Sequence, residues 1–194
     1  DTVYFSHDTY IGADTQIEPN VVFAVGVTVE NNATIRAFSH LEGCHVSRES
    51  VVGPYARLRP GAELSEGVKI GNFVEIKNAT IDAGAKVNHL SYIGDAQIGE
   101  KSNVGAGTIT CNYDGVFKHR TTIGKNVFVG SNTMLVAPVS LGDDSMTATG
   151  TIVTKNVPDG DLAVGRARQE NKTGFARRMF EKLKSKKANA AKES

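Results

Sequence analysis

An aliphatic or aromatic residue returns at almost every sixth position for nearly the whole chain, and this repeat constrains the fold more than any other feature. The repeated residues are Phe5, Ile11, Ile17, Phe23, Val29, Ile35, Leu41, Val46, Val52, Leu58, Leu64, Ile70, Ile76, Ile81, Val87, Ile93, Ile98, Val104, Ile123, Val129, Leu135, Leu141, Thr147 and Val153. A fixed hexapeptide period is the signature of a parallel β-helix, a solenoid of short stacked strands. No α-helix fits this repeat, because six matches neither 3.6 nor 3.5 residues per turn.

Three faces of six residues make a triangular coil, and each repeated residue then points inward and stacks on its counterpart one coil earlier. The expected spacing between coils is roughly 4.7–4.9 Å, the distance between strands of a sheet. Gly and Asn supply the unusual backbone angles that sharp corners need. The sequence therefore predicts an all-β parallel β-helix of about eight coils, a prism roughly 35–40 Å long by the same spacing.

The repeat also predicts how the chain is divided. Residues 1–157 are expected to form one solenoid domain, interrupted between Val104 and Ile123 by an inserted polar loop over 110–122. A turn at 158–160 should end the repeat, and 158–194 should form a tail. Within the tail, 169–187 suits a short helix whose apolar stripe we expect to pack on a neighbouring surface. The stripe consists of Phe175, Met179, Phe180 and Leu183. The last Lys/Ala/Ser stretch is expected to be disordered, and the first residue, Asp1 rather than Met, predicts a fragment of a longer protein.

Charge and composition limit the possible partners. From Arg166 onward ten Lys and Arg face three Glu, which leaves a mildly acidic solenoid with a basic tail. Such a tail is either a solvated end or a means of holding a polyanion. No apolar run is long enough to span a membrane, and two cysteines favour a reducing cytoplasm. Small outward residues on flat faces indicate a cyclic homo-oligomer.

The region from Gly53 to Ser131 is richest in residues that can do chemistry. Arg59 and Lys77 lie one coil apart, so their side chains should stack on the same edge, and His89 and Tyr92 follow in the next coil. Two cations, an imidazole and a tyrosine together suit a phosphorylated, hydroxyl-rich ligand.

Four runs in this region are much more specific than the repeat: RLRPGAEL, GNFVEIK, HLSYIGD and GAGTITCNYDG. Through them the stretch from Gly53 to Arg166 closely resembles the acetyltransferase domain of the bacterial bifunctional N-acetylglucosamine-1-phosphate uridylyltransferase / glucosamine-1-phosphate acetyltransferase family. The resemblance implies a left-handed coil, an exception to the usual right-handed crossover, and a cytoplasmic homotrimer with active sites between subunits. The family's uridylyltransferase domain, to which its magnesium belongs, is missing from this sequence, so we expect no metal here.

The resemblance also implies a reaction, in which an acetyl group moves from acetyl-CoA to the 2-amino group of glucosamine 1-phosphate, toward UDP-N-acetylglucosamine for cell-wall and lipopolysaccharide synthesis. The amine must lose a proton to attack a thioester, and a base that titrates near neutrality is needed. By resemblance His89 is that base. The oxyanion is expected to be stabilised near Gly105, Ala106 and Gly107.

The remaining site residues also come from the resemblance. Those for glucosamine 1-phosphate are Arg59, Lys77, Tyr92, Asn103 and Lys118, the last on a loop that reaches a neighbouring subunit in the family. Those for acetyl-CoA are Ala106, Asn112, Tyr113, Ser131, Thr149 and Arg166. The sequence departs from the family where Thr147 replaces an aliphatic residue and where Thr149 stands in place of the common Ala.

Other readings of the sequence are open. Another sugar or amino-acid acyltransferase of the hexapeptide group is the main alternative. A zinc lyase on the same fold would use three histidines, and His40 and His45 have a suitable spacing, with His7 upstream. A trimerising scaffold without activity would leave the inserted loop unexplained. Nucleic-acid binding by the tail is disfavoured, because the basic residues are not interleaved with aromatic ones.

Overall fold

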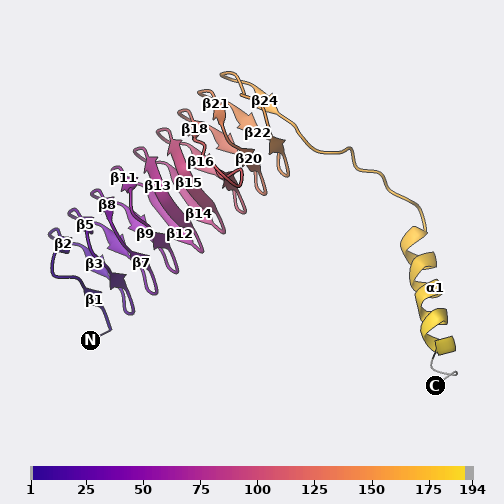
Figure 1. Cartoon of the computed structure of the whole chain (residues 1–194), viewed down its shortest axis with the longest axis horizontal. Helices are drawn as coiled ribbons and strands as arrows, with labels where there is room; N and C mark the ends of the chain where they lie inside the picture. Colours follow the sequence, from indigo (N-terminus) through magenta and orange to yellow (C-terminus); the bar gives the residue numbers. More distant parts are fainter. Residues whose placement is uncertain (1, 191–194) are drawn as a thin grey trace.

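The computed structural model describes residues 2–190, and most of this chain winds into a stack of coils with three faces (Figure 1). Face 1 contains β1 (Tyr4–Phe5), β4 (Val22–Phe23), β7 (His40–Leu41), β10 (Arg57–Leu58), β17 (Ile109–Cys111), β20 (Met134–Val136) and β23 (Ile152–Val153). Face 2 contains β2 (Tyr10–Ile11), β5 (Thr28–Val29), β8 (Cys44–Val46), β11 (Ala62–Leu64), β18 (Thr121–Ile123) and β21 (Val139–Leu141). Two longer strands, β13 (Glu75–Ile81) and β15 (Tyr92–Ile98), turn the corner and belong to both faces.

Face 3 is a separate sheet of nine strands. Its members are β3 (Gln16–Ile17), β6 (Thr34–Ile35), β9 (Val51–Val52), β12 (Lys69–Asn72), β14 (Lys86–His89), β16 (Asn103–Val104), β19 (Phe128–Val129), β22 (Met146–Thr147) and β24 (Leu162–Ala163). Neighbouring strands on each face pair in parallel, which confirms the predicted parallel β-helix. The sheet has one strand more than the eight coils expected, because β24 pairs with β22 beyond the predicted end at Val157.

The inward stack of repeated residues forms the core. On face 1, for example, Ile76 pairs with Leu58 in the coil before and with Ile93 in the coil after, and all three are fully buried. Thr147 also points inward, although it is polar. Its hydroxyl lies 3.0 Å from that of Thr133 and accepts a hydrogen bond from the N–H of Gly130, so the departure from the repeat is satisfied.

The inserted loop is shorter than the repeat indicated. Thr110 is 1 % exposed and occupies an inward position on β17, between Ile93 and Leu135. Its hydroxyl donates to the carbonyl of Gly94 and accepts from the Gly94 N–H. The aliphatic repeat does not reveal this inward position, because a threonine fills it. The solenoid is therefore interrupted only between β17 and β18.

Bulky residues occupy some corners where Gly and Asn were expected. Phe38, Tyr55, Phe73 and Leu90 all have positive φ, and all four are about half exposed. Phe38 stacks on Tyr55 with ring centroids 4.8 Å apart, and Tyr55 stacks on Phe73 at 5.3 Å. Left-handed backbone is costly for such residues, and stacking between successive corners offsets part of that cost. We call these four residues the corner ridge.

The C-terminal segment differs from its predicted form. The helix α1 spans Phe175–Ala190, later than the predicted 169–187, and begins directly after Gly174, whose φ is +68°. It lies apart from the coils at the end of an extended segment (Figure 1). Its apolar stripe is exposed, with Phe180 57 % accessible, so the expected packing is not made among residues 2–190. Residues 191–194 of the stretch predicted to be disordered lie outside the described residues. Within the described chain, no helix has the length and apolar character needed to cross a membrane.

Truncating an inward residue should destabilise the prism. Ile76→Ala removes a side chain that is 0 % exposed and leaves a cavity, so we expect the free energy of unfolding to fall by about 2–5 kcal/mol. The exposed Ile152→Ala is the matched control and should change it by less than about 0.5 kcal/mol. Chemical denaturation followed by circular dichroism measures both, and equal effects would contradict an inward stack.

Candidate active site

A column of small and polar residues follows the corner where face 3 meets face 1. Asn72 pairs directly with His89, and the N–H of Gly107 donates to the His89 carbonyl one coil later. The same ladder continues along the axis. The N–H of Asn132 donates to the Ala106 carbonyl, and the N–H of Gly150 donates to the Ser131 carbonyl. The predicted residues His89, Ala106, Ser131 and Thr149 therefore lie in one line along the axis, which we call the corner column. A guanidinium nitrogen of Arg166 donates to the Thr149 carbonyl at its end.

His89 is exposed at the end of β14, and one of its ring nitrogens is already engaged. Its Nδ1 lies 2.9 Å from the side-chain oxygen Oδ1 of Asn72. A hollow beside the imidazole is lined by Arg36, Gly53, Lys69, Asn72 and Asn88, among others. An exposed imidazole with one nitrogen hydrogen-bonded and the other free has the form of a general base.

The backbone near His89 has one N–H group available to a ligand. The N–H of Gly105 donates to the Val129 carbonyl, and that of Gly107 donates to the His89 carbonyl. Of the three residues predicted to stabilise an oxyanion, only Ala106 has an N–H without a hydrogen-bond partner among residues 2–190. Of the three predicted residues, Ala106 is therefore the one whose N–H group could stabilise an oxyanion.

Cations gather at the other edge of face 1. Arg59 donates to Glu75 at 2.9 Å, and Lys77 follows one coil later with its ammonium 3.4 Å from Asp95. The neutral amine of Lys118, which can accept a hydrogen bond from the Lys77 ammonium, and the charge of Asp95 raise the pKa of Lys77, whereas the Lys77 ammonium lowers the pKa of Lys118. Arg59 lowers the pKa of Lys118 further. The predicted stacking of Arg59 and Lys77 is present, and Lys118 joins them as the cation cluster.

Tyr92 reaches this cluster because Gly94 leaves room for its ring. A Cβ atom built on Gly94 would lie 2.4 Å from the Tyr92 hydroxyl and 2.9 Å from Asn112 Nδ2. Tyr92, Asn112, Tyr113 and Lys118 line one shallow hollow. Residues predicted for the two different substrates therefore meet at this point.

Asp95 is a residue of the site that sequence reasoning missed. It is 8 % exposed, and it accepts hydrogen bonds from the side-chain amides of Asn78 and Asn112 at 2.6 and 2.5 Å. Burial works to raise its pKa, but these two hydrogen bonds and the Lys77 charge outweigh it and hold the pKa below 3.8. One buried carboxylate thus fixes Lys77 and the first residue of the inserted loop. The HLSYIGD run contains Asp95, but nothing in its spacing shows that the side chain is buried.

The inserted loop is held together by Asp114. Its carboxylate accepts from the N–H groups of Val116 and Phe117 and lies 2.7 Å from Nε2 of His119. The bond to His119 and the backbone bonds lower the pKa of Asp114 to about 2. A bridge between Tyr113 and Lys118 closes the hairpin. Lys118 is thereby presented toward Lys77 from an ordered loop.

The predicted residues do not meet in a single cleft of one chain. Among the described residues no hydrogen bond or ion pair joins His89 to Arg59, Lys77 or Tyr92, and two separate hollows contain His89 and Lys118. The predicted cluster of two cations, imidazole and tyrosine is therefore only partly formed. Asn103 lies on face 3, paired between Lys86 and Phe128, and not with the cation cluster on face 1.

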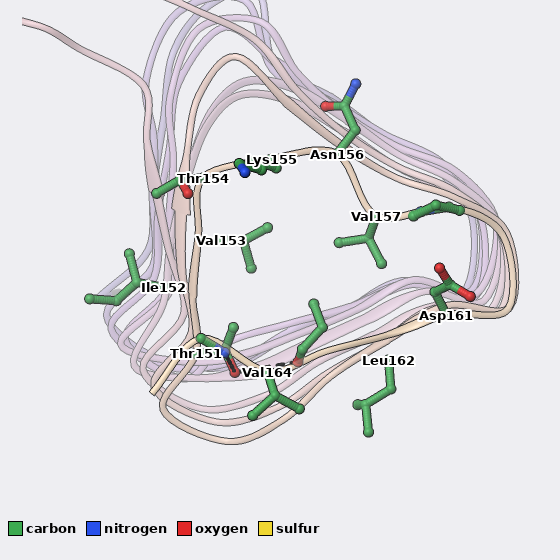
Figure 2. A pocket seen from close by; sticks show the side chains of 13 residues that line it. Thr151, Ile152, Val153, Thr154, Lys155, Asn156, Val157, Asp161, Leu162 and Val164 are labelled. Carbon is green, nitrogen blue, oxygen red and sulfur yellow. Dashed lines mark hydrogen bonds between the residues drawn. The ribbon is translucent and has the colours of Figure 1, made fainter. Parts of the chain in front are cut away.

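Two further hollows lie near the C-terminal end of the solenoid. The first lies at the C-terminal end of the core, where the side chains of Val153 and Val157 point into the triangle of the coil (Figure 2). Its lining mixes aliphatic with polar and charged residues and contains none of the predicted site residues. The second is lined by Val164 and residues 166–169, and it includes Arg166.

The histidines considered for zinc do not converge. His40 lies on face 1, whereas His45 lies on face 2 between Glu30 and Glu63, with its nitrogens 3.0 and 3.6 Å from their carboxylates. Cys44 is buried, and burial raises the pKa of its thiol to about 12. Residues 2–190 contain no group of three His, Cys, Asp or Glu placed to hold a metal ion.

Comparison with known proteins defines the family. Residues 40–139, just over half of the chain, match the family described as the GMPPB C-terminal domain, and the chain belongs to it. The bifunctional protein GlmU of Dinoroseobacter shibae is 70% identical over 187 residues, which are 96% of this chain and 42% of that protein. GlmU of Ruegeria sp. is 68% identical over 192 residues, 99% of this chain and 43% of that protein. These relatives confirm the resemblance as a whole, and the chain spans less than half of their length.

Solved structures confirm the left-handed β-helix implied by the resemblance. LpxA from Acinetobacter baumannii superposes with a TM-score of 0.57 at 15% identity, covering 86% of this chain and 70% of that one. The Arabidopsis UDP-N-acetylglucosamine acyltransferase gives 0.51 at 14% identity, covering 91% and 75%. At such low identity the likeness concerns the fold alone.

Asp95→Asn should show what the buried charge contributes to stability. We expect the variant to be less stable than the wild type by about 1–3 kcal/mol at neutral pH, because an amide cannot accept all the bonds that the carboxylate accepts. The folded-state pKa is depressed, so this contribution is complete above the ordinary value of 3.8 and is lost as the pH falls through the folded pKa. Denaturation curves between pH 7 and 2.5 measure it, with the exposed Asp161→Asn as control. Equal stability of Asp95→Asn and the wild type at pH 7 would contradict a stabilising role of the buried carboxylate.

Proposed function

We propose that this chain transfers the acetyl group of acetyl-CoA to the 2-amino group of glucosamine 1-phosphate. The observation that carries the proposal is an exposed His89 at the head of the corner column, with the cation cluster at the other edge of the same face. High identity to GlmU over the whole chain supports it.

In the proposed reaction, the amino nitrogen of the sugar attacks the thioester carbonyl carbon, and Nε2 of His89 takes a proton from that amino group. The new C–N bond leaves a negative oxygen, which we expect the N–H of Ala106 to stabilise. Collapse of this intermediate breaks the C–S bond and releases CoA as a thiolate. The thiolate is a good leaving group, so no covalent enzyme intermediate is required.

Acetyl-CoA is proposed to lie along the corner column. Ala106, Ser131 and Thr149 are small residues stacked along the axis, and they allow a long pantetheine arm to lie against the coil. Arg166 lies at the end of this line and suits a CoA phosphate. Asn112 and Tyr113 lie with Lys118 at the other edge of face 1, so we propose that they reach this acetyl-CoA from a neighbouring copy of the chain.

The sugar phosphate is proposed to bind the cation cluster. Arg59, Lys77 and Lys118 supply positive charge for the phosphate, and Tyr92 can hydrogen-bond a sugar hydroxyl. Phosphate binding should favour full protonation of Lys118, because a dianion reverses the repulsion that lowers its pKa.

A homotrimer would complete this site. Asn103 faces outward on face 3, and Val116 and Phe117 are 74 % and 68 % exposed at the loop tip. Both features fit a second copy of the chain better than solvent. We infer a cytoplasmic homotrimer in which neighbouring chains bring His89, Asn103 and the cation cluster together.

Replacing the proposed base tests the reaction. The His89→Ala variant should lose at least about 100-fold in kcat for glucosamine 1-phosphate, because the proton acceptor is removed. The exposed His40→Ala is the control and should retain the wild-type rate. A coupled assay of released CoA thiol measures both. An unaltered rate in His89→Ala would remove this residue from the mechanism, and wild-type turnover of only other amines would favour another acyltransferase.

Lys77→Ala tests the phosphate site. We expect KM for glucosamine 1-phosphate to rise at least about tenfold, because one charge-assisted hydrogen bond to the phosphate is lost. KM for acetyl-CoA should remain near the wild-type value. The exposed Lys125→Ala controls for general loss of positive charge. Initial rates at varied sugar phosphate measure the effect, and a rise confined to KM for acetyl-CoA would place the phosphate elsewhere.

A further inference from the structure

We propose that Asn72 is a positioning residue that holds His89 in one tautomer, with the proton on Nδ1 and the lone pair of Nε2 free. Its catalytic consequence rests on the proposed function, but the tautomer itself does not. No motif in the sequence distinguishes Asn72 from the many corner asparagines of the repeat. Only its partner, the proposed base in the next coil, sets it apart.

The fold fixes this pair through its register. Asn72 ends β12, His89 ends β14, and the two residues are direct partners in neighbouring coils. The coils approach closely here, because a Cβ atom built on Gly71 would lie 2.0 Å from the Asn88 carbonyl oxygen. The Leu90 N–H also donates to the Asn72 carbonyl. The side chains therefore meet with Oδ1 and Nδ1 2.9 Å apart and little freedom to separate.

The chemistry of the two atoms determines where the proton lies. An amide oxygen only accepts hydrogen bonds, so Nδ1 must donate, and a neutral imidazole then has no proton on Nε2. In the coil on the other side of His89 stands Ala106, whose methyl group neither donates nor accepts. Nε2 is thus left free for a substrate amine.

A neutral partner orients the ring without adding charge. The charged residues lining the hollow beside His89 are Arg36 and Lys69, and no carboxylate lines it. In a histidine–carboxylate pair, the anion would stabilise the imidazolium. Asn72 instead fixes the tautomer and leaves the charge balance of the ring unaltered, which suits a base that must take up and then release a proton.

Nitrogen NMR of histidine tests the tautomer without any substrate. With ring-labelled protein above pH 8, we expect His89 to show a protonated Nδ1 and an unprotonated Nε2. In Asn72→Ala this preference should be lost, because free histidine favours the proton on Nε2. Asn88→Ala, which removes a neighbouring asparagine from the same hollow, should keep the wild-type signal. An Nε2-protonated signal in the wild type would overturn the proposal. So would an unchanged preference for the Nδ1-protonated form in Asn72→Ala.

Kinetics then test the consequence. Asn72→Ala should lower kcat at least about tenfold, a part of the effect of a general base, with both KM values near wild type. In Asn72→Asp the acid limb of the kcat–pH profile should move to higher pH, because a carboxylate stabilises the imidazolium. An unchanged kcat in Asn72→Ala would overturn the positioning role. If the wild type did not acetylate glucosamine 1-phosphate at all, the proposed reaction would fail, while the NMR result would still decide the tautomer.

Discussion

The stacking of inward side chains between successive coils is the interaction on which the rest of the structure depends. Leu58, Ile76 and Ile93 show it on face 1, where each buries its neighbour and the backbone ladder sets their spacing. Because every coil has the same register, a residue's position in the repeat decides its neighbours above and below. Functional side chains far apart in sequence are thereby brought into straight lines, without any long-range contact of their own.

The corner between faces 3 and 1 shows how such lines differ along the axis. The corner ridge ends at Leu90, directly after His89, and Gly107, Asn132 and Gly150 continue it with small side chains in the same left-handed conformation. The surface thus changes from a bulky apolar edge to a flat one at the proposed base. This change of bulk leaves the corner free of large side chains beside Ala106, Ser131 and Thr149, where the long, thin ligand is proposed to lie.

The two edges of face 1 use electrostatics in different ways. At one edge the neutral amide of Asn72 lies against the His89 ring, and no carboxylate lines the hollow beside it. At the other edge the buried charge of Asp95 anchors Lys77 and the first residue of the loop, and it favours a fixed ammonium. A base needs a balanced environment, whereas an anion site needs permanent positive charge.

The sequence by itself determined the parallel β-helix, the inward residues and the stacking of Arg59 on Lys77, because a period of six can be satisfied by one packing and register follows from counting. It could not show the strand at Thr110, where a polar residue fills a core position, nor the last strand after Val157, which falls outside the aliphatic pattern. Only the tertiary structure decided the burial of Asp95, the contact between the side chains of His89 and Asn72, and the exposure of α1. Those features depend on side-chain directions and on which surfaces meet, and residue spacing carries no information about either.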